Sequence, residues 1–229
     1  MLKFYFHHTP NPMKVALFLE EAGLDYETIP VDTFKGEQHE PSFRAINPNG
    51  KLPAIDDNGT IVFDSNAILL YLADKIGQFN GTPAHRGELL SWLMFIATGV
   101  GPFSGQAVHF TYIHQDSSYA TNRYKREVER HYNVLDKCLA DREFIVGDNY
   151  SIVDMASWGW LDRANFVLKN DDALDATPNL KRWFQTTDMR PAVARARLLR
   201  EKFTFKADFD EATQRALFPQ NFAPGTATP

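Results

Sequence analysis

Cysteine is nearly absent from this sequence, whose 229 residues include only Cys138. A single cysteine excludes a framework of internal disulfide bonds, a metal site built from several thiols and a redox pair of neighbouring cysteines. Cys138 falls on the apolar face of an expected helix, where a cysteine behaves as inert packing. We therefore expect no redox chemistry from a thiol of the chain itself.

Signals for membranes, secretion and nucleic acid are also lacking. No run of about 18 apolar residues exists, so we expect no membrane-spanning helix. The N-terminal stretch MLKFYFHHTP has neither the apolar segment nor the cleavage site of a signal peptide. The net charge is -5, and the most basic stretch, residues 123–130, is interrupted by Glu127 and Glu129. We expect a reduced, cytoplasmic protein that binds neither nucleic acid nor membrane.

The histidines do not form a metal-binding pattern. His109 and His114 lie close in sequence but have no carboxylate partner nearby. His7 and His8 are expected to point to opposite faces of an extended segment, so they cannot bind one ion together. The sequence therefore predicts no metal site.

The first third of the chain has the pattern of an α/β domain. Residues 2–6 and 26–31 read as strands, and the helix between them is expected to begin with Asn11 as its N-cap and to end at Gly23. A strand–helix–strand unit of this length makes the two strands parallel. Residues 35–46 show no clean period, which predicts a loop with room for a short helix.

The stretch NPNGKLPAIDDNGTIVFDSNA, residues 47–67, predicts a hairpin followed by a helix. Its strands are expected at residues 51–55 and 60–63. A cis bond before Pro53 would leave the backbone donor and acceptor of Leu52 free for a peptide-like ligand. The next helix is expected to begin at Asp64-Ser65, where a carboxylate, a hydroxyl and the helix N-terminus can hold both charges of an α-amino acid.

The rest of the chain is predicted to be helical. Helices are expected over residues 86–110, with an interruption at Gly99, Gly101 and Pro102, over 119–139, over 155–168, and after Pro178 and Pro191. The sequence SIVD at 151–154 is a variant of the capping box. We predict a first domain at 1–78, a linker near 77–84, an all-helical domain at 86–205 and a polar tail at 206–229, frayed around Pro224 and at 226–229.

These elements together resemble the glutathione transferase family, whose thioredoxin-like domain carries a cis-proline and an acidic-Ser pair. The segments FHHTPNPMKVALFLEEAGLDYETIPVDTFKGEQ, GVGPFSGQAVHF and YATNRYKREVERHYNVL resemble the nu class of that family. The run FIVGDNYSIVDMASWGW is similar to the family's sixth helix with its capping box. The resemblance extends from Phe4 to about Leu199. It implies a thioredoxin-like α/β N-terminal domain followed by an all-α C-terminal domain, the glutathione transferase fold.

The resemblance also implies which residues bind glutathione, since the nu class presents a Thr-Pro-Asn loop to the sulfur. Matching positions give Thr9 and Asn11 as catalytic residues at the sulfur, Leu52 with Pro53 at the cysteinyl backbone, Asp64 and Ser65 at the γ-glutamyl end, Gln38 at the glycyl end, and Arg123 as a further contact. Lys51 is added for its chemistry, as a second partner of the glycyl carboxylate. His7 and His8 depart from the family pattern. Tyr5 lies mid-strand, which favours a packing role over the catalytic tyrosine of other classes.

Hydrogen bonds to the sulfur carry most of this chemistry. A free thiol has a pKa of ~8.5. To lower this pKa by one unit, the site must favour the thiolate over the thiol by about 1.4 kcal/mol. A helix N-terminus contributes roughly 0.3–1 kcal/mol, whereas each hydrogen bond to a charged group contributes about 1.5–3 kcal/mol. Thr9 and Asn11 are the candidate donors.

The leading hypothesis is a glutathione-dependent disulfide-bond reductase with transferase or peroxidase side activity. Bound glutathione, as its thiolate, would attack a substrate disulfide, and a second glutathione would resolve the mixed disulfide. One alternative is a transferase that conjugates glutathione to electrophiles. Another is a non-catalytic glutathione-binding regulator or scaffold, because no Tyr, Ser or Cys occupies the loop. The resemblance further implies a homodimer.

Overall fold

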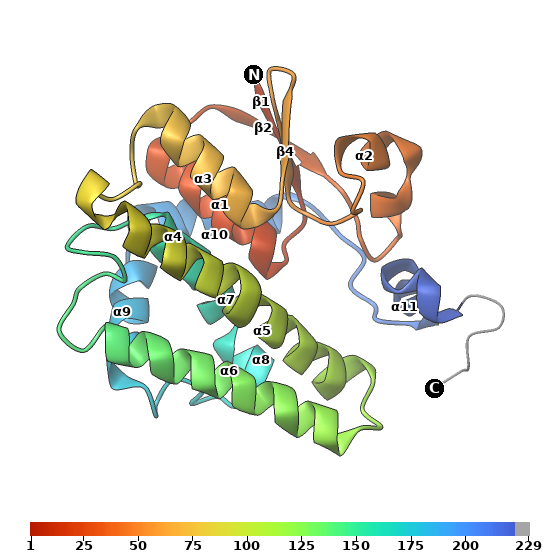
Figure 1. The fold of residues 1–229 in the computed structure, drawn as a ribbon. Coiled ribbons are helices and arrows are strands. Elements are labelled where there is room, and N and C mark those ends of the chain that lie inside the picture. The colour runs from red at the N-terminus through yellow and green to blue at the C-terminus, as the bar shows by residue number, and fades with distance from the viewer. Residues whose placement is uncertain (223–229) are drawn as a thin grey trace.

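A four-stranded sheet forms the centre of the N-terminal half (Figure 1). The computed structural model describes residues 1–222, so the predicted fraying around Pro224 and at 226–229 lies outside the described part. Strands β1 (Leu2–Phe6) and β2 (Tyr26–Pro30) are parallel, and the hairpin of β3 (Ala54–Asp57) and β4 (Thr60–Phe63) is antiparallel. The strand order β2-β1-β3-β4 is the predicted thioredoxin-like arrangement.

Helices cover both faces of this sheet. Helices α1 (Pro10–Ala22) and α3 (Ser65–Ile76) share the large core with Phe4 of β1. The short helix α2 (Pro41–Ile46) packs on the opposite face, where Phe43 and Ala54 form a second, small core. The alternation of side chains along β1 divides the residues between these two cores.

Tyr5 follows this alternation. Its ring meets the ring of Phe43 edge-on, with the centroids 5.7 Å apart. It therefore packs against α2, as the sequence predicts, and contributes no hydroxyl to the opposite side of the sheet.

Two boundaries in this half differ from the predictions, both because of proline. Helix α1 begins at Pro10 with Thr9 as N-cap, so the prediction of Asn11 as N-cap is wrong. Pro10 suits the first helical position because its φ is fixed and its missing N–H is not needed there. Strand β3 begins at Ala54, after the predicted start, because Pro53 has no N–H for the ladder. The predicted cis bond between Leu52 and Pro53 is present.

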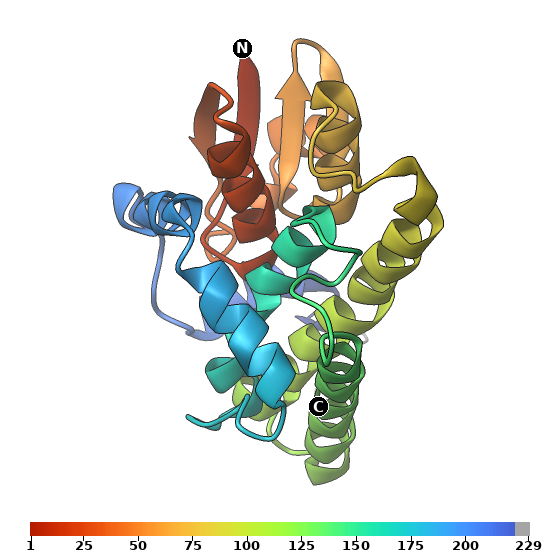
Figure 2. The same ribbon diagram turned by 90° about the vertical axis from the view of Figure 1, so that its left-hand side faces the viewer.

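The C-terminal half is helical. Its elements are α4 (Arg86–Phe95), α5 (Gly101–Val108), α6 (Ser118–Cys138), α7 (Ile152–Leu161), α8 (Ala164–Leu168), α9 (Pro178–Asp188) and α10 (Pro191–Lys202). Helix α1 packs against both α7 and α10, so the two halves share one continuous core (Figure 2). None of the helices in residues 1–222 is long and apolar enough to cross a membrane.

The interruption and the capping box predicted in this half are present, whereas one predicted helix is divided in two. The predicted interruption near Gly99 is a π-helical segment at Ile96–Val100 that joins α4 to α5. The capping box is confirmed: the Ser151 hydroxyl accepts a backbone N–H of α7, and Asp154 accepts the Ser151 backbone N–H at 2.9 Å. The single helix predicted over 155–168 is wrong, because the chain breaks between α7 and α8.

The C-terminal segment returns to the first half of the chain. The ring of Phe205 contacts the buried ring of His7 at a tilt, with centroids 4.3 Å apart, and the Lys206 N–H donates to Asp32 at 2.8 Å. Helix α11 (Glu211–Leu217), within the predicted polar tail, then lies near α2 (Figure 1). The ring centroids of His7 and His8 are 4.4 Å apart, so the prediction of opposite faces is wrong. Strand β1 ends at Phe6, and alternation does not continue into the turn.

Candidate functional site

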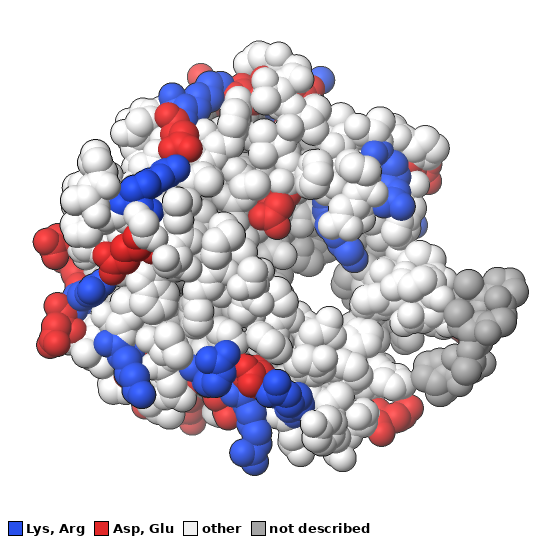
Figure 3. Space-filling model, viewed as in Figure 1, with Lys and Arg blue, Asp and Glu red and all other residues white. Residues whose placement is uncertain are grey.

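A cavity of about 490 Å³ opens between the sheet-containing half and α5. Pockets of this size commonly hold small ligands. The first half lines it with the start of α1, the loop before β3 and the start of α3, and the second half lines it with α5 and Trp160. Predicted site residues at its wall are Asn11, Lys51, Leu52, Pro53, Asp64 and Ser65. Figure 3 shows a hollow between α2 and α5, bordered by α11 and by mostly uncharged side chains.

Asn11 occupies the first turn of α1 and is held by Trp160 of α7. The indole N–H donates to the Oδ1 of Asn11 at 3.1 Å. An indole can only donate, so the amide oxygen must face Trp160 and the amide NH₂ is left for the cavity. Gly101 lets α5 approach this pair, because a Cβ there would lie 3.1 Å from the indole nitrogen. The arrangement presents an N–H donor beside the positive end of α1.

The loop before β3 presents backbone groups to the same cavity. Among the described residues, no backbone hydrogen bond involves Leu52, and Leu52 lines the cavity. The neighbouring loop is fixed by Asn47, whose amide donates to the Lys51 carbonyl at 2.6 Å and whose Oδ1 accepts the Asn49 N–H at 3.0 Å. A peptide-like ligand can therefore pair with an ordered, unpaired stretch of main chain.

The start of α3 combines a carboxylate with helix N–H donors. Asp64 is the N-cap, and its Oδ1 accepts the N–H of Asn66 at 2.9 Å and of Ala67 at 3.2 Å. Its φ of 73° is unusual for a residue other than glycine, as is common at binding sites. Ser65 is buried at the cavity wall beside it. This end can accept an ammonium at Asp64 and donate to a carboxylate from the helix N-terminus.

Lys14 is a charged group at this wall that the sequence did not single out. Its side chain is buried, and its Nζ donates to the Ser65 Oγ at 3.4 Å. Burial lowers its pKa to about 8, although the nearby Asp64 carboxylate acts in the opposite direction. The signal available in the sequence was a lysine inside an apolar stripe, three residues after Asn11. Trp160 was likewise missed, because a helical tryptophan reads as core.

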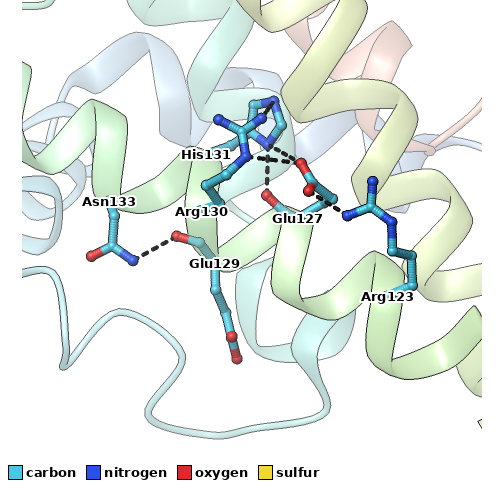
Figure 4. A network of polar contacts seen from close by, with 6 residues as sticks. All are labelled: Arg123, Glu127, Glu129, Arg130, His131 and Asn133. Atoms are coloured by element: carbon cyan, nitrogen blue, oxygen red, sulfur yellow. Dashed lines mark hydrogen bonds and ion pairs between the residues drawn. The ribbon is translucent and has the colours of Figure 1, made fainter. Parts of the chain in front are cut away.

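Other predicted site residues lie outside the cavity wall. Thr9 caps α1 through its backbone, and its side chain makes no capping hydrogen bond. Gln38 is buried under the C-terminal segment, where its Nε2 donates to the Ala216 carbonyl at 3.0 Å. Arg123 is exposed on α6 and paired with Glu127, which also binds Arg130 (Figure 4). Their roles toward a ligand stay predictions.

Two further features concern metal binding and thiol chemistry. Within the described residues, no group of three His, Cys, Asp or Glu side chains is arranged to hold a metal ion. Cys138 lies on α6, and its Sγ donates to the Ile145 carbonyl at 3.6 Å. Burial raises the pKa of this thiol, so it is protonated at neutral pH.

Comparison with known proteins identifies relatives along most of the chain. Residues 2–74 match the sequence model described as Glutathione S-transferase, N-terminal domain, and residues 101–191 match that of the C-terminal domain. The disulfide-bond oxidoreductase YfcG of Escherichia coli (strain K12) is 42% identical over 207 residues, covering 86% of this chain and 95% of YfcG.

Solved structures give the same result. A glutathione transferase from Burkholderia graminis, with two glutathione molecules bound per subunit, has a TM-score of 0.79 and 37% identity over 85% of this chain and 86% of its own. One from Phanerochaete chrysosporium, in complex with oxidized glutathione, has a TM-score of 0.82 and 35% identity over 88% of this chain and 96% of its own. The predicted fold, a thioredoxin-like domain followed by an all-α domain, is confirmed.

Proposed function

Because the chain belongs to the glutathione transferase family, we propose that it binds glutathione in the cavity and uses the glutathione thiolate to reduce disulfide bonds. The observation that carries the proposal is the orientation of Asn11, whose NH₂ is left for the cavity by the Trp160 indole. A donor at this place stabilises a thiolate more than a thiol.

The polar and charged groups of the remaining wall suit the charged ends and the peptide backbone of glutathione. We expect the γ-glutamyl end to lie at the start of α3, with its ammonium at Asp64 and its carboxylate at Ser65. The cysteinyl backbone would pair with Leu52, as predicted from the sequence. Lys51 is exposed at the rim and can bind the glycyl carboxylate.

The proposed chemistry needs two glutathione molecules and no protein cysteine. The first thiolate attacks one sulfur of the substrate disulfide, forming a mixed disulfide and releasing the other sulfur as a thiolate. A second glutathione thiolate attacks the glutathione sulfur of the mixed disulfide, giving oxidised glutathione and the second substrate thiolate. The Burkholderia graminis relative, with two glutathione molecules per subunit, is consistent with such a site.

Turnover measurements separate this proposal from its alternatives. The wild-type protein is incubated with glutathione and either a small disulfide or an activated aryl halide. Faster turnover of the disulfide supports the reductase. Faster turnover of the aryl halide would instead support a transferase, and glutathione binding without either reaction would support a regulator or scaffold.

We further propose a cytoplasmic homodimer. Exposed apolar side chains support an interface, among them Phe63 at the end of β4 and Met94 near the end of α4, which are 42% and 46% exposed. Sedimentation equilibrium tests this proposal: the mass of a single 26.1 kDa chain would contradict it. Arg123 is paired with Glu127 outside the cavity of its own chain, so in such a dimer it would have to reach the cavity of the second copy to contact glutathione.

A further inference from the structure

Lys14 reaches the cavity by an unusual route. It belongs to α1, yet its side chain is only 1% exposed and runs between α1 and α7 to end at Ser65. A lysine is almost never buried without a partner of opposite charge. In the described part of the chain, no carboxylate lies within ion-pair distance of its ammonium. The protein therefore carries a desolvated cation at the wall of its binding cavity.

Gly159 of α7 provides the space for this route. A Cβ at position 159 would lie 2.5 Å from the Cγ of Lys14 and 2.7 Å from the Pro10 carbonyl. Any larger residue would displace the lysine or separate the two helices. The packing of α1 on α7 thus accommodates the lysine stem rather than excluding it.

The hydrogen bond between Lys14 and Ser65 can have only one direction. An ammonium has three donors and no acceptor, so Lys14 must donate to the Ser65 Oγ, at 3.4 Å. The Ser65 hydroxyl hydrogen must then point elsewhere, and Ser65 lines the cavity. A hydroxyl that accepts from a cation is also a stronger donor to an anion.

We propose that Lys14 is a positioning residue: by donating to Ser65 it directs the serine hydroxyl at the α-carboxylate of the γ-glutamyl group and supplies a buried positive charge behind it. This inference rests on the proposed binding of glutathione. The lowered pKa of Lys14, about 8, fits a cation that gains its counter-charge only when the ligand binds. Asp64 is the charged side chain that acts on Lys14 in the absence of ligand.

Binding of S-methylglutathione by calorimetry tests the proposal, because this ligand has no thiol to ionise. Lys14→Met, which keeps the length of the stem, is expected to bind about tenfold more weakly or worse than wild type. The same loss is expected in Ser65→Ala, and the double variant should be little worse than either single one. The melting temperature of Lys14→Met should equal or exceed that of wild type, because a desolvated charge is removed.

A second ligand measures how much of the binding depends on the α-carboxylate of the γ-glutamyl group. The S-methyl analogue that lacks the γ-glutamyl α-carboxylate should bind Lys14→Met and wild type equally. Equal loss for both ligands, or no loss for either, would overturn the role of Lys14 while leaving glutathione binding intact. Failure of wild type to bind S-methylglutathione would overturn the proposed function itself.

Proton uptake gives a measurement that needs no variant. Near pH 8, binding of S-methylglutathione to wild type should take up more protons than binding of the analogue, as shown by calorimetry in two buffers of different ionisation enthalpy. The two amino groups differ in pKa, because only one has a neighbouring carboxylate; the uptake by each is therefore calculated from a titration of the free ligand and subtracted. The remaining difference reports on the protein. Equal uptake for the two ligands would contradict the proposal, even if Lys14→Met did not fold.

Discussion

The indole of Trp160 fixes the amide of Asn11 across 149 positions of the chain, with 3.1 Å between the indole nitrogen and Oδ1. The pair joins the first turn of α1 to α7, so it links the two halves of the molecule at the cavity. The hydrogen bond also has a chemical consequence: with the amide oxygen held by the indole, the amide NH₂ of Asn11 faces the cavity.

Trp160→Phe should reduce disulfide turnover roughly two- to tenfold, the effect of one lost hydrogen bond of about 0.5–1.5 kcal/mol. An aromatic side chain is kept, although a smaller one, but the Asn11 amide becomes free to rotate and to present its oxygen to the sulfur. Trp183→Phe is the matched control, since its indole donates to Asp154 at 2.9 Å, away from the cavity. It should lower stability and leave turnover unchanged. Equal turnover in Trp160→Phe and wild type would contradict the role of Trp160.

Cys138→Ala should leave disulfide turnover nearly unchanged. The thiol lies outside the cavity wall, donates to the Ile145 carbonyl, and has a pKa that burial raises. Steady-state turnover with glutathione and a small disulfide measures the effect. A large loss of turnover in a folded Cys138→Ala variant would show that the protein uses its own thiol.

Asp154→Ala should destabilise the protein by about 3 kcal/mol or more, beyond the loss of a helix cap alone. The buried carboxylate accepts from the backbone of Ile145 and Ser151, the Ser151 hydroxyl and the Trp183 indole, and all four donors would be left unsatisfied. Ser117→Ala, at the N-cap of α6, is the control and should cost about 0.5–2 kcal/mol. Urea unfolding measures both. Similar losses in the two variants would contradict the proposed importance of the Asp154 network.

Stability should fall with decreasing pH in a way that depends on His7. Burial lowers the pKa of His7 to about 4, from an unfolded value near 6.5. Below pH 6.5 the unfolded chain binds a proton that the folded protein does not, so its free energy of unfolding falls between pH 6.5 and 4, by at most about 3 kcal/mol.

His7→Phe removes this contribution, so its stability should depend less on pH over that range than that of wild type. Unfolding by denaturant at several pH values provides the comparison. Cys138→Ala, which changes no histidine, is the control and should follow wild type over this range. Identical pH profiles for His7→Phe and wild type would refute the assignment to His7.

The parts of the fold that depend on neighbouring residues could be predicted from the sequence. The Ser151–Asp154 capping box and the hairpin before α3 are local patterns, and both are present. The predicted N-cap of α1 lies two residues too late, because Asn11 and Thr9 are both good N-caps and only the backbone at Pro10 decides between them.

The parts that depend on distant contacts could not be predicted. Lys14 and Trp160 reach the cavity only because α1 packs on α7, a contact between segments far apart in sequence. Gln38 was predicted at the glycyl end of glutathione, but no local signal shows that the Ala216 carbonyl would take its amide. Asp64, Ser65 and Leu52 follow one another along a single hairpin and helix start, which is why the sequence could place them at one wall.

The central claim is that Asn11 holds the glutathione sulfur as a thiolate, and titration of the bound thiol tests it most directly. The ultraviolet absorbance of the thiolate is followed against pH in saturated complexes of wild type and Asn11→Ala. The account predicts a pKa well below ~8.5 in wild type and a value higher by about one unit or more in the variant. The same pKa in both complexes would contradict it.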